Sequence, residues 1–560
     1  MHSIPRLSLL LCASYTCCFA YLDPSTGSLL LSSFIALIAS IIFLSKSIFY
    51  KAVQIVVGGG AESLNPLRKR DTHTLVFYSE GKQYHNVFSP ILLALDQFDY
   101  PYTYLTSSQE DYDLYHISPP KNPNATFAYI GDSNSNAAIA QLNSLKADLV
   151  VMTTPQLDVL QIKRSKGVKH YCHIIHSLPH IDIYEIFALD YFDSVLTNSP
   201  IHTDFIRQVE SKRALKHKQV IITGCTYLDV LAQKLQDYRQ TQEKFAFFPQ
   251  QKATQNHNQK VDSSQSPKAA LESTFSKDSA CGLESQSGDE TSLNLLESTF
   301  ATSTTPTAPT ILIAPTILIA PSWGREALLS KYGFAIIKPF INTRFQLIIR
   351  PHPQSYLSET SILQELQERT KHCKNIVWDS NRDNIYALDA ADVMIGDFSG
   401  VLFDFVCLFE KPVLTPEFTF CNIGYDLEDI YPTPWVQSAL PRIGRQFHPK
   451  DLHHLPTIIE SMLGDKDSMQ ESLRAMKQEL WHFQGSGGEQ SARALLAIES
   501  QILESSLGHN LPLHKRILAI QKILATPALE SSTQVSLDPI PLSAHQAKVS
   551  KAHKLNKQGA

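Results

Sequence analysis

From Thr72 onward, short apolar runs alternate with amphipathic stretches and polar turns. Short apolar runs bounded by turn residues are typical of buried strands, and apolar residues at helical spacing are typical of helices. Alternation of the two predicts a parallel sheet covered by helices on both faces. We therefore predict a first α/β domain at residues 72–240, with strands that include 75–78, 127–130, 149–152 and 220–222.

The same pattern returns after a long polar segment and predicts a second α/β domain at residues 316–500. Its expected strands include 317–320, 345–349, 376–378, 393–395 and 413–414. The hexamer APTILI occurs twice in tandem, and we take the second copy as the first strand because it runs directly into a polar turn. Residues 241–315 are rich in Gln, Ser, Thr and Asn and poor in apolar residues, which predicts a disordered linker.

Two apolar runs precede the first domain. Residues 1–20 have an early arginine, an apolar core and small residues at their end, as secretory signal peptides do. The second run, Ser28 to Leu44, is near the lower limit for a membrane-spanning helix, and basic residues follow it. Because basic residues favour the cytoplasmic side, we predict that residues 1–50 are a signal-like segment and a single transmembrane helix. The α/β domains would then lie in the cytoplasm, tethered to the inner (cytoplasmic) membrane.

Charge and composition narrow the choice of function. A formal net charge of -5 and a pI near 6.5 argue against a nucleic-acid-binding protein held by global charge. The cysteines form no Cys-x-x-Cys pair, so neither a zinc knuckle nor a disulfide framework is indicated. Residues 505–560 are predicted to be a polar tail with a basic end, either solvated or in contact with anionic lipid.

Three histidines follow an apolar run in the sequence HIIHSLPHIDIYE: His173, His176 and His180. The break at 177–179 places them in a loop at the C-terminal end of a strand. A histidine titrates near neutral pH, so one of them can take a proton from an attacking hydroxyl. The spacing also invites a metal site, but Pro179 interrupts any helix that would align the rings, and we predict no metal.

A second polar stretch, QLIIRPHPQS, ends a buried strand at Arg350 and His352. Its two prolines stiffen the turn and hold both side chains at fixed angles. An arginine can grip phosphate oxygens through its planar fork, and a histidine can donate to or protonate an oxygen. The structural alternative is that Arg350 pairs with a neighbouring carboxylate and His352 caps a carbonyl group.

The third stretch, residues 391–416, has the pattern of strand, tight turn, helix and strand. The turn at Ser399 and Gly400 leaves backbone N–H groups at a helix N-terminus, where the peptide dipoles favour an anion such as phosphate. Ser399 can equally be a plain N-cap. Asp404 lies among apolar residues and needs a partner, for which a ligand hydroxyl and an arginine are both candidates. Lys411 follows the helix.

Taken in order, ILIAPSWG, RPHP and GDFSGVLFDFVCLFEKP resemble the C-terminal half of the CDP-glycerol glycerophosphotransferase family, which polymerises glycerol phosphate in teichoic-acid-type polymers. The HSLP at residues 176–179 resembles that family's HGTP element. The resemblance covers roughly residues 145–500 and implies a GT-B fold, a pair of Rossmann-like domains that hold the nucleotide mainly in the second. Two motifs depart from the family pattern: Ser177-Leu178 replaces Gly-Thr, and Gly400 replaces the second of two serines.

The resemblance also implies roles for individual residues. His176 would act as the base on the acceptor hydroxyl, and His352 would act on the diphosphate. The helix turn would hold phosphate, and the aspartate that follows it would touch the glycerol or ribose side of the donor. The predicted donor- and phosphate-binding residues are Arg350, Ser399, Gly400, Asp404 and Lys411. The resemblance implies no cofactor.

These observations predict a membrane-tethered transferase that moves a glycerol-phosphate or related polyol-phosphate group from a CDP-activated donor to a lipid-linked or cell-surface polymer acceptor. The second hypothesis is a GT-B glycosyltransferase that uses a nucleotide sugar, because the same basic groups and helix terminus would serve it. The third is a membrane-anchored binding protein with a degenerate site, since a fold alone does not guarantee an activity. No nucleic-acid partner is expected.

Overall fold

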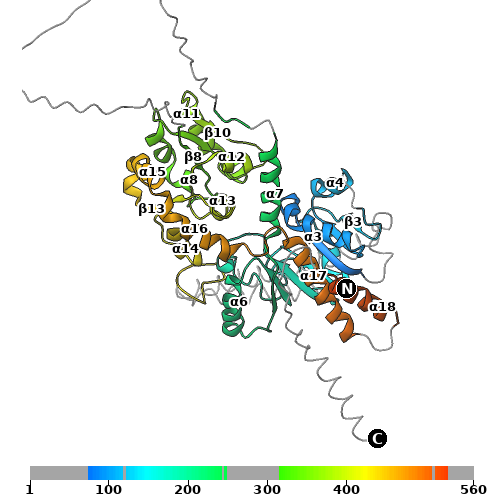
Figure 1. Ribbon diagram of the computed structural model, residues 1–560. Helices are drawn as coiled ribbons and strands as arrows, with labels where there is room; N and C mark the ends of the chain where they lie inside the picture. The colour runs from blue at the N-terminus through cyan, green and yellow to red at the C-terminus, as the bar shows by residue number, and fades with distance from the viewer. Residues whose placement is uncertain are drawn as a thin grey trace, which may run out of the picture.

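The computed structural model describes residues 73–117, 121–241, 245–248, 314–381, 383–506 and 511–527. These residues form two α/β units that lie side by side (Figure 1). The predicted signal-like segment and transmembrane helix at 1–50 lie outside the described residues, and so does nearly all of the predicted linker at 241–315. Within the described ranges, no helix combines the length and the apolar character needed to cross a membrane.

The first unit is a parallel sheet in the strand order β3-β2-β1-β4-β5-β6-β7. Its strands are β1 (His73–Ser79), β2 (Thr103–Thr106), β3 (Thr126–Tyr129), β4 (Lys146–Met152), β5 (Gly167–Ile174), β6 (Ser194–Thr197) and β7 (Gln219–Ile222). Its helices are α3 (His85–Gln97), α4 (Gln109–Ile117), α5 (Asn136–Asn143), α6 (Ile201–Lys212) and α7 (Thr226–Gln240). The direction of winding reverses between β1 and β4, as in doubly wound folds.

The central strands of this sheet are buried on both faces, which requires nearly continuous apolar residues. In β1, Leu75 and Phe77 belong to a core cluster on one face, together with residues of α3. Val76 and Tyr78 belong to the cluster on the other face, together with residues of α5 and α6. The alternation of side chains along one strand therefore supplies both cores at once.

The second unit repeats the topology with the order β10-β9-β8-β11-β12-β13. Its strands are β8 (Thr316–Ile319), β9 (Gln346–Ile349), β10 (Ile376–Trp378), β11 (Val393–Ile395), β12 (Val413–Pro416) and β13 (Gly444–Phe447). Its helices are α8 (Leu328–Tyr332), α9 (Phe334–Ile337), α10 (Ser355–Ser358), α11 (Thr360–Thr370), α12 (Ile385–Ala390), α13 (Val401–Phe409), α14 (Trp435–Ile443), α15 (Leu455–Gly464) and α16 (Lys466–Leu480). The reversal of winding lies between β8 and β11.

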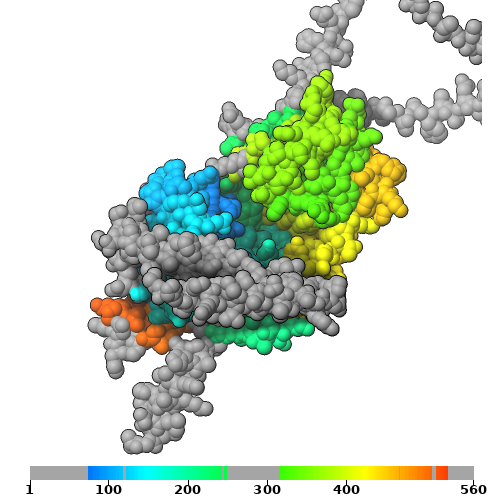
Figure 2. All heavy atoms as spheres, turned by 180° about the vertical axis from the view of Figure 1, so that it is seen from behind, coloured from blue at the N-terminus to red at the C-terminus, as the bar shows by residue number. Residues whose placement is uncertain are grey.

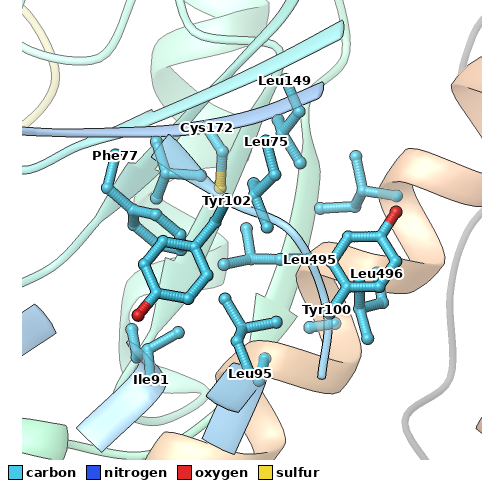
Figure 3. Close-up of a cluster of buried hydrophobic side chains, with 14 of the residues drawn as sticks. Leu75, Phe77, Ile91, Leu95, Tyr100, Tyr102, Leu149, Cys172, Leu495 and Leu496 are labelled. Atoms are coloured by element: carbon cyan, nitrogen blue, oxygen red, sulfur yellow. The ribbon is translucent and has the colours of Figure 1, made fainter. Parts of the chain in front are cut away.

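The chain then returns to the first unit through α17 (Gly487–Ser505) and α18 (Leu511–Ala525). In Figure 3, Leu495 and Leu496 of α17 lie in one apolar cluster with Leu75 of β1 and Leu95 of α3. Figure 2 shows the orange atoms of this C-terminal segment at the end of the first unit, away from the yellow second unit. Helix α17 therefore completes the core of the first sheet, although the second unit precedes it in the chain.

The predicted α/β class with parallel sheets is confirmed, and every expected strand overlaps an observed one. The sequence pattern gave no signal for β2, β6 and β13, which are short. The strand expected before the three histidines is β5. The sequence also assigned residues 487–500 to the second domain and residues from 505 on to a polar tail. In the structure, α17 and α18 instead pack on the first sheet, because their apolar residues fill one face of its core.

The packing of α17 on α3 is close at Gly488. A Cβ atom at this position would lie 2.7 Å from both the Cβ and the carbonyl oxygen of Pro90, a separation that requires the helices to move apart. We expect Gly488→Ala to lower the free energy of unfolding by about 1–3 kcal/mol in chemical denaturation. Gly464 at the end of α15 is the matched control, since its Cβ would meet nothing within 4 Å. Equal stabilities for the two variants would contradict the close packing.

Candidate functional site

In doubly wound sheets, ligands bind outside the carboxyl ends of the strands where the winding reverses. In the second unit this point lies between β8, which leads into Ser322, and β11, which leads into Asp397. The predicted motifs RPHP and GDFSG follow β9 and β11, so both lie at this edge. In the first unit the HSLP loop follows β5, at the corresponding edge of its sheet.

The carboxylate of Asp397 organises the edge of the second sheet. It accepts hydrogen bonds from the backbone N–H groups of Ser322 at 3.0 and 3.1 Å and of Leu328 at 2.8 Å, which lie in the loop after β8 and at the start of α8. It also accepts the N–H groups of Phe398 at 2.8 Å and Ser399 at 3.2 Å. Asp397 is almost fully buried, and burial raises its pKa despite these bonds. One side chain thus ties together the two loops that flank the reversal point.

The turn of the GDFSG motif keeps part of its hydrogen-bonding capacity. Ser399 is half-buried, and Gly400 is the N-cap residue of α13 without a side-chain cap. Within the described ranges, the N–H groups of Gly400 and Val401 have no hydrogen-bond acceptor. Two N–H groups at the start of a nine-residue helix are suited to an anion, and the Ser399 hydroxyl lies beside them.

The RPHP loop contributes His352 but commits Arg350 elsewhere. The Nδ1 atom of His352 accepts a hydrogen bond from the N–H of Gln354 at 3.1 Å. The proton of the neutral ring is therefore on Nε2, and burial keeps the ring neutral by lowering its pKa. Arg350 forms an ion pair with Asp379 and donates to the carbonyl oxygen of Asn381 at 2.9 Å. The Arg350 guanidinium is therefore paired with a carboxylate, as the structural alternative for this residue predicts.

Two residues near His352, Trp323 and Glu359, were not among the predicted site residues, although Trp323 belongs to the ILIAPSWG motif. The ring of Trp323 is half exposed, and its centroid lies 6.4 Å from that of His352. Glu359 accepts hydrogen bonds from the N–H of Gly324 and the hydroxyl of Ser330, both at 2.7 Å, and so anchors the loop that carries Trp323. An exposed tryptophan indicates a binding site only when its neighbours in space are known. Here the neighbour is His352, which follows a different strand, β9.

In the HSLP loop, His176 is held between two tyrosines. Its ring centroid lies 5.1 Å from that of Tyr84 in an edge-on contact and 6.1 Å from that of Tyr184 in a nearly parallel one. Burial lowers the pKa of His176 to about 4, so the imidazole is unprotonated at neutral pH. Its Nδ1 atom is buried and has no hydrogen-bond partner among the described residues. The ring is therefore neutral and held between two aromatic rings, with a ring nitrogen that no described residue bonds.

The other two histidines of this stretch have different surroundings. The Nδ1 atom of His180 accepts the N–H of Asp182 at 3.2 Å, so its Nε2–H donates to the carbonyl oxygen of Ile201 at 2.9 Å. His173 is fully buried against Phe192, with ring centroids 5.0 Å apart. In the part of the chain that the structure describes, no group of three His, Cys, Asp or Glu side chains is arranged to hold a metal ion.

The ends of β4 and β6 add polar atoms next to the HSLP loop. Asn198 donates a hydrogen bond from its side chain to the carbonyl oxygen of Ser177 and so holds the loop. The side-chain oxygens of Thr153, Asn198 and Ser199 are buried without hydrogen-bond partners among the described residues. A buried polar group without a partner costs about 1–3 kcal/mol. Buried polar atoms of this kind commonly bond water.

The HSLP loop and the GDFSG turn meet across the two units. A side-chain carbon at Gly400 would lie 3.5 and 3.6 Å from the Cγ and Cδ atoms of Pro179. Leu178 is buried in the same apolar cluster as Leu402 and Phe403 of α13. Both departures from the family pattern, Leu178 and Gly400, therefore lie in the contact between the units.

The remaining two predicted residues do not join this turn. Asp404 is buried, and its carboxylate accepts a hydrogen bond from the Tyr227 hydroxyl of α7 at 3.0 Å. Lys411 lies beyond the other end of α13 and donates to the carbonyl oxygens of Asp389 and Ala391 at the end of α12. Its ammonium group therefore supports the helix C-terminus rather than the N–H groups near Ser399.

The family model described as CDP-Glycerol:Poly(glycerophosphate) glycerophosphotransferase matches residues 302–420. This segment contains APSWG, RPHP and GDFSG with its helix. The resemblance that the motifs predict is thus confirmed over these residues, and the chain is similar there to a CDP-glycerol glycerophosphotransferase-like transferase. No curated protein matches the sequence.

Solved structures that align with the chain are distant. The wall teichoic acid polymerase TagF is 14% identical, with 84% of this chain and 99% of that chain covered and a TM-score of 0.43. A putative UDP-N-acetylglucosamine 2-epimerase from Listeria monocytogenes is 11% identical, with 77% and 97% covered and a TM-score of 0.44. At these scores neither likeness enters the argument about fold or function.

Asp404 gives the site a pH-dependent stability. Burial raises its pKa from 3.8 to about 7. Between these values the folded protein keeps a proton that the unfolded chain has lost, so stability falls as the pH rises through this window. We expect Asp404→Asn to match the wild type near pH 4 and to exceed its free energy of unfolding by about 1–3 kcal/mol at pH 8.

Chemical denaturation at both pH values measures this difference. The exposed Asp113 provides the control, since Asp113→Asn removes a carboxylate that faces solvent. A loss of stability in Asp404→Asn at pH 8 would mean that the ionised carboxylate is stabilised by its surroundings, contrary to the expectation.

Proposed function

We propose that this chain transfers a glycerol-phosphate or related polyol-phosphate group from a CDP-activated donor to the hydroxyl of an acceptor. The observation that carries the proposal is the contact between the HSLP loop of one sheet and the GDFSG turn of the other, at Pro179 and Gly400. A base on the first unit and an anion site on the second thereby lie at adjoining edges. The match of residues 302–420 to the glycerophosphotransferase family supports the donor class.

The donor side would be formed by the second unit. The free N–H groups of Gly400 and Val401, with the Ser399 hydroxyl, are suited to bond oxygens of the diphosphate. The Nε2–H of His352 would donate to an oxygen of the same group, since its Nδ1 is already occupied by the backbone. These donors would stabilise the charge that develops on the diphosphate as CMP leaves. Arg350 would keep its loop in place through Asp379 rather than bind phosphate.

The acceptor side would be formed by the first unit. His176, neutral at physiological pH, would take the proton of the acceptor hydroxyl as its oxygen attacks the phosphorus that bears the polyol. The new P–O bond forms as the bond to the CMP oxygen breaks, and the electron pair of that bond leaves with CMP.

The proposal extends to the location of the reaction. The signal-like segment and the apolar run at residues 1–50, followed by basic residues, support tethering to the inner membrane with the α/β units in the cytoplasm. A tether at the membrane would bring the enzyme to a lipid-linked or cell-surface polymer acceptor.

Nucleotide release from purified protein and membrane extract tests the proposal. We expect CMP from CDP-glycerol or a related CDP-polyol, and a loss of about hundredfold or more in His176→Ala and in His352→Ala. His453→Ala is the control, because this histidine is exposed on the surface of the second unit.

Either of two results would contradict the proposal. Release of UMP or UDP from UDP-sugars, with no CMP from CDP-linked donors, would assign the chain to the nucleotide-sugar glycosyltransferases. Full activity in both histidine variants, with their folding intact by circular dichroism, would exclude the assigned roles.

A further inference from the structure

A segment of the second unit crosses to the first between β12 and α14. We call residues 420–431 the strap. Leu427 of the strap is fully buried in the core cluster of the first unit, with Ile181 and Leu189. Phe420, Tyr425, Ile430 and Tyr431 pack against the same cluster. The strap therefore anchors one unit in the hydrophobic core of the other.

The strap also pairs with the backbone that directly follows the HSLP loop. Tyr425 forms an antiparallel bridge with Glu185, and the N–H of Ile186 donates to the carbonyl oxygen of Gly424 at 2.9 Å. In the other direction, the N–H of Asp426 donates to the carbonyl oxygen of Tyr184 at 2.8 Å. These bonds fix the main chain of residues 184–186.

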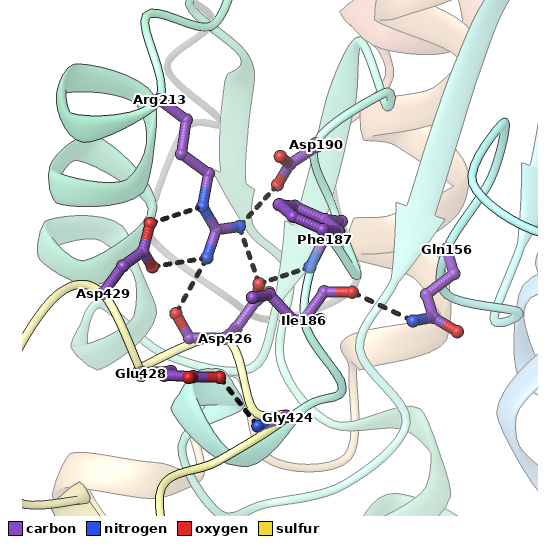
Figure 4. Close-up of polar contacts among 9 residues, drawn as sticks. All are labelled: Gln156, Ile186, Phe187, Asp190, Arg213, Gly424, Asp426, Glu428 and Asp429. Atoms are coloured by element: carbon purple, nitrogen blue, oxygen red, sulfur yellow. Dashed lines mark hydrogen bonds and ion pairs between the residues drawn. The ribbon is translucent and has the colours of Figure 1, made fainter. Parts of the chain in front are cut away.

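Arg213, directly after α6, fastens this arrangement (Figure 4). Its guanidinium donates to Asp426 and Asp429 of the strap at 2.8 and 2.7 Å, and to Asp190 of the first unit at 2.9 Å. The Asp426 carboxylate in turn accepts the N–H of Phe187 at 2.8 Å. The Arg213 side chain is only 8% exposed, so its charge is little screened by water.

The charges around Arg213 make it indispensable to this contact. Three carboxylates face it, and the nearby ammonium of Lys218 is buried without a hydrogen-bond partner in the described part of the chain. Burial already raises the pKa of Asp426 to about 6. Without the guanidinium, the carboxylates of the strap and of Asp190 would repel one another across the contact.

The strap reaches the proposed base through one residue. Tyr184, whose carbonyl oxygen accepts the N–H of Asp426, places its ring nearly parallel to that of His176 at 6.1 Å. The chain of contacts therefore runs from Arg213 to the strap, from the strap to Tyr184, and from Tyr184 to His176.

We propose that the strap, fastened by Arg213, orients the His176 imidazole, so that the acceptor-side base is aligned only while the second unit is docked on the first. Arg213 is then a positioning residue that touches no reactant. This inference rests on the proposed function for the role of His176, whereas the mechanical linkage from Arg213 to His176 does not depend on it.

The test compares Arg213→Met with the wild type in the release of CMP from CDP-glycerol. We expect kcat to fall about tenfold to hundredfold, since misplacement of a catalytic group by about 1 Å has effects of this size. The KM for the donor should stay within about twofold, because the diphosphate site belongs to the second unit. Arg213→Lys, which keeps the charge, should recover part of kcat.

The matched control is Arg442→Met. Arg442 lies on α14, the helix that follows the strap, and among the described residues its side chain pairs only with Glu479 at the surface. Its loss removes an arginine from the same region without a bond to residues 182–190, so kcat should not change. A fall in kcat equal to that of Arg213→Met would show that the effect is not specific to the strap.

Carbethoxylation of histidines by diethyl pyrocarbonate, followed by mass spectrometry, reads out the linkage without activity. His176 should react several-fold faster in Arg213→Met than in the wild type, with the exposed His453 as internal standard. Unchanged reactivity together with unchanged kcat would overturn the proposal. If the wild type released no CMP, the proposed function would fail, and the linkage would stand or fall on this reactivity alone.

If Arg213→Met does not fold, a second variant tests the same path. Tyr184→Leu keeps the backbone bonds to the strap and removes the ring that faces His176 and, at 6.2 Å, His173. The same loss of kcat with an unchanged thermal midpoint is expected. Normal kcat in this variant would exclude the path through Tyr184.

Discussion

The buried carboxylate of Asp397 is the constraint on which the proposed donor side depends. It takes up the N–H groups of Phe398 and Ser399 and those of Ser322 and Leu328, so that two loops from neighbouring strands keep one geometry. The Asp397 carboxylate occupies the N–H groups of Phe398 and Ser399. The proposed anion site therefore consists of the next N–H groups along the chain, at the start of α13. A diphosphate bound there would lie next to a carboxylate. The Asp397 carboxylate is already bonded to backbone N–H groups, and the neutral His352 can donate to the diphosphate without adding or removing charge.

The sequence predicted where chemistry can occur better than which side chains perform it. The apolar runs located the strands, and polar residues that follow a strand in a parallel sheet must lie at its carboxyl edge, so HSLP, RPHP and GDFSG were found together. Hydrogen-bond partners come from distant positions and leave no local pattern. Arg350 pairs with Asp379, directly after the next strand, and Lys411 bonds the end of a preceding helix. Tyr184 and Trp323 became significant only because folding places them beside His176 and His352.

Two residues that depart from the family motifs, Leu178 and Gly400, lie in the same contact. Leu178 is buried in an apolar cluster with residues of α13, and a Cβ atom at Gly400 would make ordinary van der Waals contact with Pro179. Both positions therefore serve the contact between the units. In a site shared between two units, a motif residue can be exchanged for packing while the backbone donors and the histidines stay in place, because N–H groups do not depend on side-chain identity.

The return of α17 to the first sheet has a consequence for biosynthesis. Residues 73–240 leave the ribosome with one face of their sheet incomplete, and that face stays open to water until residues 487–505 have been made. The whole second unit is synthesised in the meantime. An open apolar face during translation attracts chaperones and promotes aggregation. The two units have separate sheets, but the first unit cannot complete its core until the second has been synthesised. A nascent chain that ends anywhere before α17 lacks the helix that closes this core.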